Sequence, residues 1–190
     1  MRSPLTSIAD LKGKRVAVGV VGSGVEANAR QILAAYGITY DDIDEQFLSF
    51  AQGARALKDG SVDAAILTAG YPTASVQDVV AQNPVRLLPV EEKIADDLIA
   101  KYPFYTKTVI PAGVYAGVDE DIESVSVMAM LAAGPTVNAD LGYKITKALF
   151  THLDRLQAAH PVGKQITRET VRDGMSLPMH EGAEKYFNEK

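Results

Sequence analysis

The 190-residue sequence contains no cysteine, which excludes disulfide bonds and thiol catalysis. Histidine is scarce: the three histidines lie far apart and match no metal-binding spacing, which argues against a histidine-based metal site. No apolar run is long enough to cross a bilayer, and the first ten residues lack the apolar stretch of a signal peptide. Taken literally, these absences predict a protein that stays in the cytoplasm.

An excess of positive charge is also absent. Lysine and arginine number 19 against 24 aspartates and glutamates, so the net charge is -5 at pH 7. A protein that binds nucleic acid or anionic membranes in general presents a basic surface, and this balance argues against both functions. With 47% hydrophobic and 23% charged residues, the composition is typical of a soluble globular protein with one domain or two small lobes.

Short apolar runs alternate with helical patterns over the first 90 residues. The runs predict strands at 15–20, 45–50, 62–67 and 85–90. Apolar residues at helical spacing predict helices at 25–36, 51–60 and 71–83, the last opened by Pro72 in its first turn. This alternation predicts an α/β fold with a mostly parallel, doubly wound sheet and flanking helices on both faces.

The pattern changes after residue 90. Helices are expected at 91–102 and 139–156, an extended segment at 105–117, a long buried strand at 124–134, and a short amphipathic helix near the end of the chain. Met128 and Met130 in the expected strand are most simply core residues.

The segment 16–33 runs from a β-branched strand through a glycine turn into an amphipathic helix. Ser23 and Glu26 have the spacing of a capping box, in which each side chain bonds the other residue's amide. Gly22 and Gly24 allow a tight turn and leave amide groups uncovered, so the helix start favours a carboxylate or phosphate. The same residues can equally cap the helix with no ligand, and the two roles can coexist.

A nucleotide is a poor fit to this turn. The sequence GVVGSG lacks the Lys-Ser/Thr pair that ends a P-loop, and its glycines do not have the G-x-G-x-x-G spacing. Glu26 at the helix start would also repel a pyrophosphate. A dinucleotide site is therefore not expected.

A second candidate stretch, 67–73, follows the third predicted strand. Ligands of open α/β sheets bind outside the carboxyl ends of strands, so this turn and the GSG turn can face one crevice. Thr68 offers a hydroxyl, Gly70 a bare amide, and Tyr71 a ring and a phenol. The alternative is a plain turn in which Pro72 starts the next helix.

Other stretches are less informative. Residues 110–117 can form a hinge, a pocket wall or a plain loop. No serine has the G-x-S-x-G context of a nucleophile, and no catalytic set emerges. The acidic clusters at 41–44 and 119–123 are interpreted as solvated surface rather than as metal or acid-base sites.

Taken in order, these stretches resemble the TAXI-type solute receptors of tripartite ATP-independent periplasmic (TRAP) transporters. The likeness extends over nearly the whole chain. The matching segments are SIADLKGKRVAVG, GSGVEANARQIL, LKDGSVDAAILTAGYPT, YPFYTKTVIPAGVYAG and LPMHEGAEKYF.

The resemblance implies a type II periplasmic binding protein-like fold, in which two α/β lobes close over a small carboxylate such as glutamate, glutamine or a dicarboxylate. It implies a periplasmic or extracytoplasmic receptor that hands its solute to TRAP membrane permease subunits, with no catalysis and no cofactor. The cleft-lining turns of the family fall on GSG and TAGYP. The implied ligand-binding residues are Ser23, Gly24, Glu26, Thr68, Gly70 and Tyr71.

The sequence departs from the family pattern at its start. Family members begin with a signal peptide and a first lobe that carries a GSTGGTYY-like segment, whereas this sequence begins where the second lobe usually does. We therefore expect residues 1–90 to form the second ligand-binding lobe, and residues 91–190 to hold a hinge or crossover and a C-terminal helical segment. A lobe without its partner is expected to expose apolar surface and to self-associate.

Two alternatives stay open. A cytoplasmic ligand-sensing domain of similar fold would need no signal peptide, although no DNA-binding helix-turn-helix is evident. A phosphate-binding α/β enzyme would need a general base near the GSG turn. No histidine lies in the first 150 residues, but a carboxylate or tyrosine base remains open.

Overall fold

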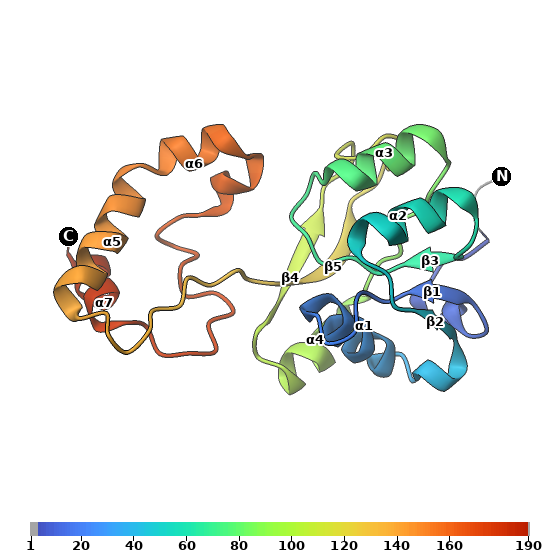
Figure 1. The fold of residues 1–190 in the computed structure, drawn as a ribbon, viewed down its shortest axis with the longest axis horizontal. Helices are drawn as coiled ribbons and strands as arrows, with labels where there is room; N and C mark the ends of the chain where they lie inside the picture. Colours follow the sequence, from blue (N-terminus) through green and yellow to red (C-terminus); the bar gives the residue numbers. More distant parts are fainter. Residues whose placement is uncertain (1–3, 190) are drawn as a thin grey trace. The chain divides into compact units, whose positions relative to one another are not determined.

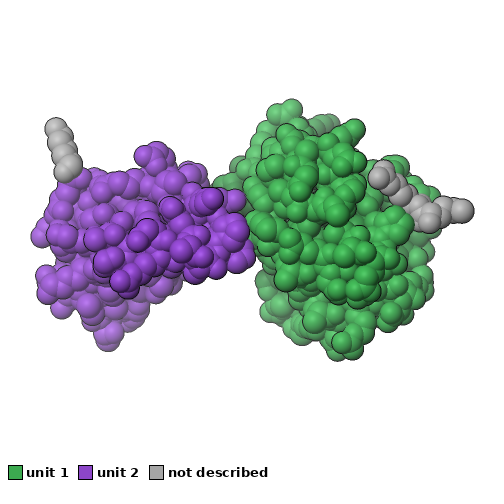
Figure 2. Space-filling model, turned by 90° about the horizontal axis from the view of Figure 1, so that it is seen from above, with its two compact units in different colours: residues 1–127 green, residues 128–190 purple. Residues whose placement is uncertain are grey.

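The computed structural model describes residues 4–189. The chain divides into two compact units, residues 1–127 and 128–190, which Figure 2 draws in different colours. The expected division at residue 90 into a lobe and a hinge region stays a prediction. In the described part of the chain, no helix is long and apolar enough to cross a membrane.

The first unit is built on a parallel sheet with strand order β2-β1-β3. β1 (Arg15–Ala17) lies in the centre, between β2 (Asp44–Gln46) and β3 (Ala64–Ala65). Ladder hydrogen bonds continue one residue beyond β1 and β3, where Val18 donates to Gln46 and Ile66 donates to Ala17. The strands are shorter than the apolar runs predicted because the carboxyl end of each run leaves the sheet.

Helices cover both faces of this sheet, as the sequence predicts (Figure 1). Val16 of β1 and Val18, the residue after the strand, form the main core with buried residues of α1 and α4, among them Leu33. Ala17 points to the other face, where Gly53 of α2 lies beside it: an ideal Cβ built on Gly53 would be 3.4 Å from the Ala17 methyl group, an ordinary contact. The helices are α1 (Gly24–Ala35), α2 (Phe50–Asp59), α3 (Ala74–Gln82) and α4 (Glu92–Lys101).

Two of the helix and strand predictions in the first unit are wrong. Residues 85–90 form no strand; only Val90 reaches a strand, donating its N–H to the Glu123 carbonyl at 3.0 Å. The helix predicted to open at Pro72 begins at Ala74, after Thr73.

The predicted strand at 124–134 forms only in part. β4 (Tyr105–Ile110) and β5 (Ile122–Val127) make an antiparallel hairpin whose last pair joins Tyr105 to Val127. The chain before Tyr105 leads back into α4, so the segment after Val127 has no strand to pair with. Met128 and Met130 are therefore exposed, at 41% and 39%, and their expected place in the core is wrong.

The second unit is helical. The single helix predicted at 139–156 is broken at His152, which separates α5 (Ala139–Thr151) from α6 (Leu153–Ala159). α5 packs against α7 (Glu181–Asn188), the short helix expected near the end of the chain. The helices come close because Gly182 has no side chain: a methyl group there would overlap the backbone of α5.

Arg168 fastens the end of α7. Its guanidinium lies 4.9 Å from the ring centre of Tyr186 and donates hydrogen bonds to the carbonyls of Tyr186, Phe187 and Glu189. A cation at a helix C-terminus stabilises the carbonyls that have no partner within the helix.

An ion pair joins the start of β1 to the residues just before β3. The Arg15 guanidinium binds both oxygens of Asp63, at 3.1 Å from Nε and 2.8 Å from Nη2, and the Arg15 amide donates to the same carboxylate at 3.0 Å. The hydrogen bonds from Arg15 lower the pKa of Asp63. The interaction is partly exposed, so its contribution is modest.

We expect Asp63→Asn to reduce the free energy of unfolding by about 1 kcal/mol near neutral pH. A carboxyl group whose pKa is lowered by folding stabilises the protein above its unfolded pKa of about 3.9, and this contribution is lost as the pH falls through the folded pKa. Urea unfolding at about pH 7 and about pH 3 should therefore show the difference from wild type shrinking in acid. Asp78→Asn is the control: the Asp78 carboxylate is more exposed than that of Asp63, pairs with Lys58 at 2.9 Å and accepts the Gln82 side-chain amide at 2.9 Å. An equal loss in both variants would contradict the prediction.

Candidate functional site

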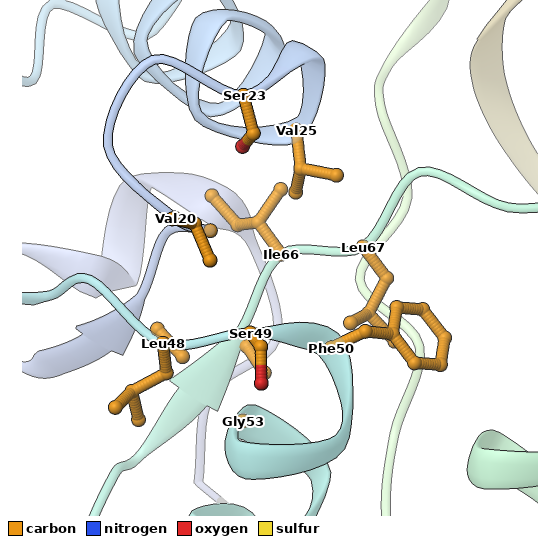
Figure 3. Close-up of a pocket in the computed structure, with 12 residues that line it drawn as sticks. Val20, Ser23, Val25, Leu48, Ser49, Phe50, Gly53, Ile66 and Leu67 are labelled. Atoms are coloured by element: carbon orange, nitrogen blue, oxygen red, sulfur yellow. The ribbon is translucent and has the colours of Figure 1, made fainter.

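The carboxyl ends of the three parallel strands open into a cavity of about 140 Å³. Ile66 and Leu67 reach it from the segment after β3, and Leu48 reaches it from the segment after β2. Ser23 at the start of α1 and Ser49 at the start of α2 lie on either side of Ile66 (Figure 3). The strand order places β1 in the middle, so the cavity occupies the crevice where open α/β sheets bind ligands.

The start of α1 presents hydrogen-bond donors at the cavity. The Ser23 Oγ accepts the amide of Glu26 at 3.2 Å, which leaves the hydroxyl proton unused among the described residues. Within residues 4–189, the amides of Gly24 and Val25 also have no hydrogen-bond partner. This agrees with the uncovered amides that the glycine turn predicts.

Gly19 lets the chain pass beneath the first turn of α1. Its φ is +97°, and a Cβ there would lie 2.9 Å from the Glu26 amide nitrogen and 3.0 Å from the Val25 Cβ. Only glycine fits both the conformation and the space. The close approach fixes the height of the α1 N-terminus above the strand end.

The start of α2 is a second capped helix terminus. Ser49 and Gln52 form a reciprocal capping box: the Ser49 amide donates to Gln52 Oε1 at 2.9 Å, and the Gln52 amide donates to Ser49 Oγ at 3.4 Å. The sequence analysis did not select Ser49. The S-x-x-Q spacing that starts at Ser49, at the end of the second apolar run, is the signal that could have identified it.

The cavity combines an apolar lining with the starts of two helices. Its lining side chains are apolar except for the hydroxyls of Ser23 and Ser49. The first turns of α1 and α2 both line it, and helix N-termini carry partial positive charge and free N–H groups. Attraction for an anion therefore comes from backbone dipoles and hydroxyls rather than from a charged side chain.

Glu26 does not complete the predicted capping box with Ser23. The Ser23 amide donates to the Val20 carbonyl instead, at 2.9 Å. The Glu26 carboxylate is buried, accepts the Tyr40 hydroxyl at 2.9 Å and pairs with Arg30 at 3.2 Å. Burial raises the pKa of Tyr40, which keeps this hydroxyl a donor. The reciprocal box is wrong because the carboxylate has these partners on and beside α1.

Thr68, Gly70 and Tyr71 follow Leu67 but do not line the cavity. Thr68 is exposed, and its Oγ1 accepts the side-chain amide of Asn28 at 3.1 Å. The Gly70 carbonyl accepts the hydroxyl of Thr73, and Tyr71 is half-buried. Ser23 is thus the one sequence-predicted residue whose side chain is part of the cavity wall, and the ligand-binding roles of all six stay predictions.

The segment 110–117 contacts the turn after β3. Tyr115 is buried, with 4% of its surface exposed, and its hydroxyl accepts the Thr73 amide at 3.0 Å. Tyr115 therefore helps to hold the turn that carries Gly70 and Tyr71. Nothing in the local pattern of residues 110–117 indicates this long-range contact.

A metal site is not found in the described part of the chain, where no group of three or more His, Cys, Asp or Glu side chains could hold an ion.

Gly19→Ala should reduce the free energy of unfolding by about 2–3 kcal/mol, because a methyl group would collide with α1 while holding a positive φ. Gly22→Ala is the matched control: its φ is also positive, at +75°, but no atom lies within 4 Å of a Cβ there. The control should lose only about 1 kcal/mol. Chemical unfolding of both variants tests this, and equal losses would show that the close approach contributes nothing.

Comparison with known proteins agrees with this architecture. The periplasmic aliphatic sulphonate-binding protein SsuA from Escherichia coli matches with a TM-score of 0.51 and 19% sequence identity, over 97% of this chain. This chain spans half the length of the SsuA chain. The likeness shows the fold, an α/β fold with a parallel sheet and flanking helices, as the sequence predicts. A family model described as NMT1-like matches residues 1–190, and the chain therefore belongs to the NMT1-like family.

Proposed function

We propose that this chain is the ligand-binding part of a TAXI-type solute receptor. In this role it binds a small carboxylate, such as glutamate, glutamine or a dicarboxylate, outside the cytoplasm and delivers it to the membrane permease of a TRAP transporter. Membership of the NMT1-like family and the SsuA-like fold support a solute-binding role. The TAXI assignment rests on the sequence segments that resemble that family.

The observation that carries the proposal is the convergence of two helix N-termini on one apolar cavity. Ser23 and Ser49, the caps of α1 and α2, both line this space, and the amides of Gly24 and Val25 have no hydrogen-bond partner among the described residues. A carboxylate accepts several such hydrogen bonds at once, and a charge-assisted bond is about twice as strong as a neutral one. The apolar lining suits the carbon skeleton of a small acid.

The six residues predicted to bind the ligand have different roles in this proposal. Ser23 and Gly24 donate to the carboxylate from the start of α1. Thr68, Gly70 and Tyr71 form the rim beyond Leu67. Glu26 is paired with Tyr40 and Arg30, so its role is to hold α1 in place rather than to bind a ligand ammonium group.

A receptor of this kind works by conformational capture rather than by catalysis. A solute that makes more contacts in a closed state than in an open one shifts the population towards closure. The closed form then carries the solute to the permease. In this proposal the cavity at the strand ends provides one wall of the binding cleft.

A thermal-shift screen tests the proposal, since a ligand that binds the native state raises the melting temperature. The probes are L-glutamate, L-glutamine, succinate, a short alkanesulfonate, phosphate, NAD and ATP. A shift with an amino acid or dicarboxylate is expected. A shift with NAD or ATP alone would favour the enzyme alternative, and a shift with the sulfonate alone would favour a ligand like that named for SsuA.

Site variants then locate the ligand. Ser23→Ala and Ser49→Ala should each weaken carboxylate affinity about tenfold, because each removes a donor to an anion. Each also removes a helix cap, which costs about 1 kcal/mol of stability. Ser7→Ala, which removes a cap remote from the cavity, is the control for that loss. Unchanged affinity in both site variants, measured by calorimetry, would contradict the assignment of the cavity.

A further inference from the structure

A chain of side-chain hydrogen bonds runs from the surface of α1 to Thr68. The Thr68 Oγ1 accepts from Asn28 Nδ2 at 3.1 Å. On its other side, Asn28 Oδ1 lies 3.0 Å from the Tyr105 hydroxyl, which lies 2.7 Å from Gln31 Oε1. Asn28 and Tyr105 are buried, with 9% and 3% of their surfaces exposed, so the bond between them is shielded from water, whereas the bonds to Thr68 and Gln31 are part-buried.

The number of available protons shows that this series of hydrogen bonds has a direction, in the sense that each group donates to the next. Burial raises the pKa of Tyr105 to about 12, so its hydroxyl keeps its single proton at neutral pH. That proton can be donated to Asn28 Oδ1 or to Gln31 Oε1, but not to both. Whichever amide does not receive it must turn its NH₂ group towards the Tyr105 oxygen.

The two directions give Thr68 opposite properties. If Gln31 donates to Tyr105, then Tyr105 donates to Asn28, and the NH₂ group of Asn28 donates to Thr68. The Thr68 hydroxyl proton then has no partner among the described residues and is free for a ligand. If Tyr105 donates to Gln31 instead, the NH₂ group of Asn28 donates to Tyr105. The Asn28 Oδ1 then accepts a hydrogen bond from the Thr68 hydroxyl, which can only accept from a ligand.

We infer that Gln31, Tyr105 and Asn28 act as positioning residues that present the hydroxyl of Thr68 as a hydrogen-bond donor to an acceptor group of the solute. The inference rests on the proposed function, since Thr68 must lie beside the bound ligand. Gln31 is half-buried at a surface groove with Arg30 and Tyr102, and its side chain makes no other hydrogen bond among the described residues, so its side-chain amide is free to turn. This series of hydrogen bonds thus favours a carboxylate, which accepts a hydrogen bond, over an ammonium group at the Thr68 position.

Gln31→Glu should reverse the direction of the hydrogen bonds between Gln31 and Thr68 without contacting the ligand. An ionised glutamate has no proton, so it must accept from Tyr105, and Thr68 then donates to Asn28. At neutral pH we expect L-glutamate and succinate to bind about tenfold more weakly. Ala34→Glu puts the same charge in the same groove without reaching Tyr105 and should bind as wild type does.

NMR spectroscopy of the ligand-free protein tests the direction of these hydrogen bonds directly. In wild type, Thr68→Val removes the acceptor of the Asn28 NH₂ group, so the ¹⁵N–¹H NMR signal of that group should move upfield and exchange faster. In the Gln31→Glu background, where the NH₂ group faces Tyr105, Thr68→Val should leave the signal in place. An Asn28 signal that responds equally in both backgrounds overturns the inference.

Together, the affinity and NMR measurements distinguish failure of the proposed function from failure of the positioning role. If neither acid binds wild type, the proposed function fails, and the NMR comparison still decides the direction of the chain. If the acids bind but Gln31→Glu matches Ala34→Glu in affinity, the role of the chain in binding is overturned while the proposed function stands. If Gln31→Glu weakens binding in wild type but not in a Thr68→Val background, the effect passes through Thr68 as inferred.

Discussion

The pairing of β1 with β2 on one side and β3 on the other is the constraint on which the candidate site depends. It places the starts of α1 and α2 at the same end of the sheet, one on each face. Val16 and Val18 hold α1 and α4 on one face, and α2 lies against Ala17 at Gly53 on the other. If either pairing slipped, the two helix N-termini would no longer share a cavity.

The electrostatics of the site come from backbone groups. Two charged residues close in sequence to those that line the cavity have partners of their own. Glu26 interacts with Tyr40 and Arg30, and Asp63 interacts with Arg15. In the proposed function, attraction for an anion therefore rests on helix dipoles, free amides and two serine hydroxyls. Such groups are fixed by the fold before any ligand arrives, so little reorganisation is needed on binding.

The predictability of the fold follows from how local each signal is. The helix at 24–35 was predictable because its cap, its apolar spacing and its terminating Gly37 all lie within the segment. The parallel sheet was predictable from the alternation of runs and helices. The strand at 85–90 and the long strand to residue 134 were wrong because strand formation needs a partner, and apolar sequence alone supplies none.

The sequence by itself determined the α/β class, the glycine turn with its free amides, and Ser23 as a cap at the cavity. Only the tertiary structure decided that Ser49 lies across the cavity from Ser23, that Glu26 pairs with Tyr40, and that Asn28 bonds Thr68. The reason is distance along the chain: caps and turns form between residues a few positions apart. These contacts join residues 14 to 40 positions apart, which meet only once the sheet is assembled.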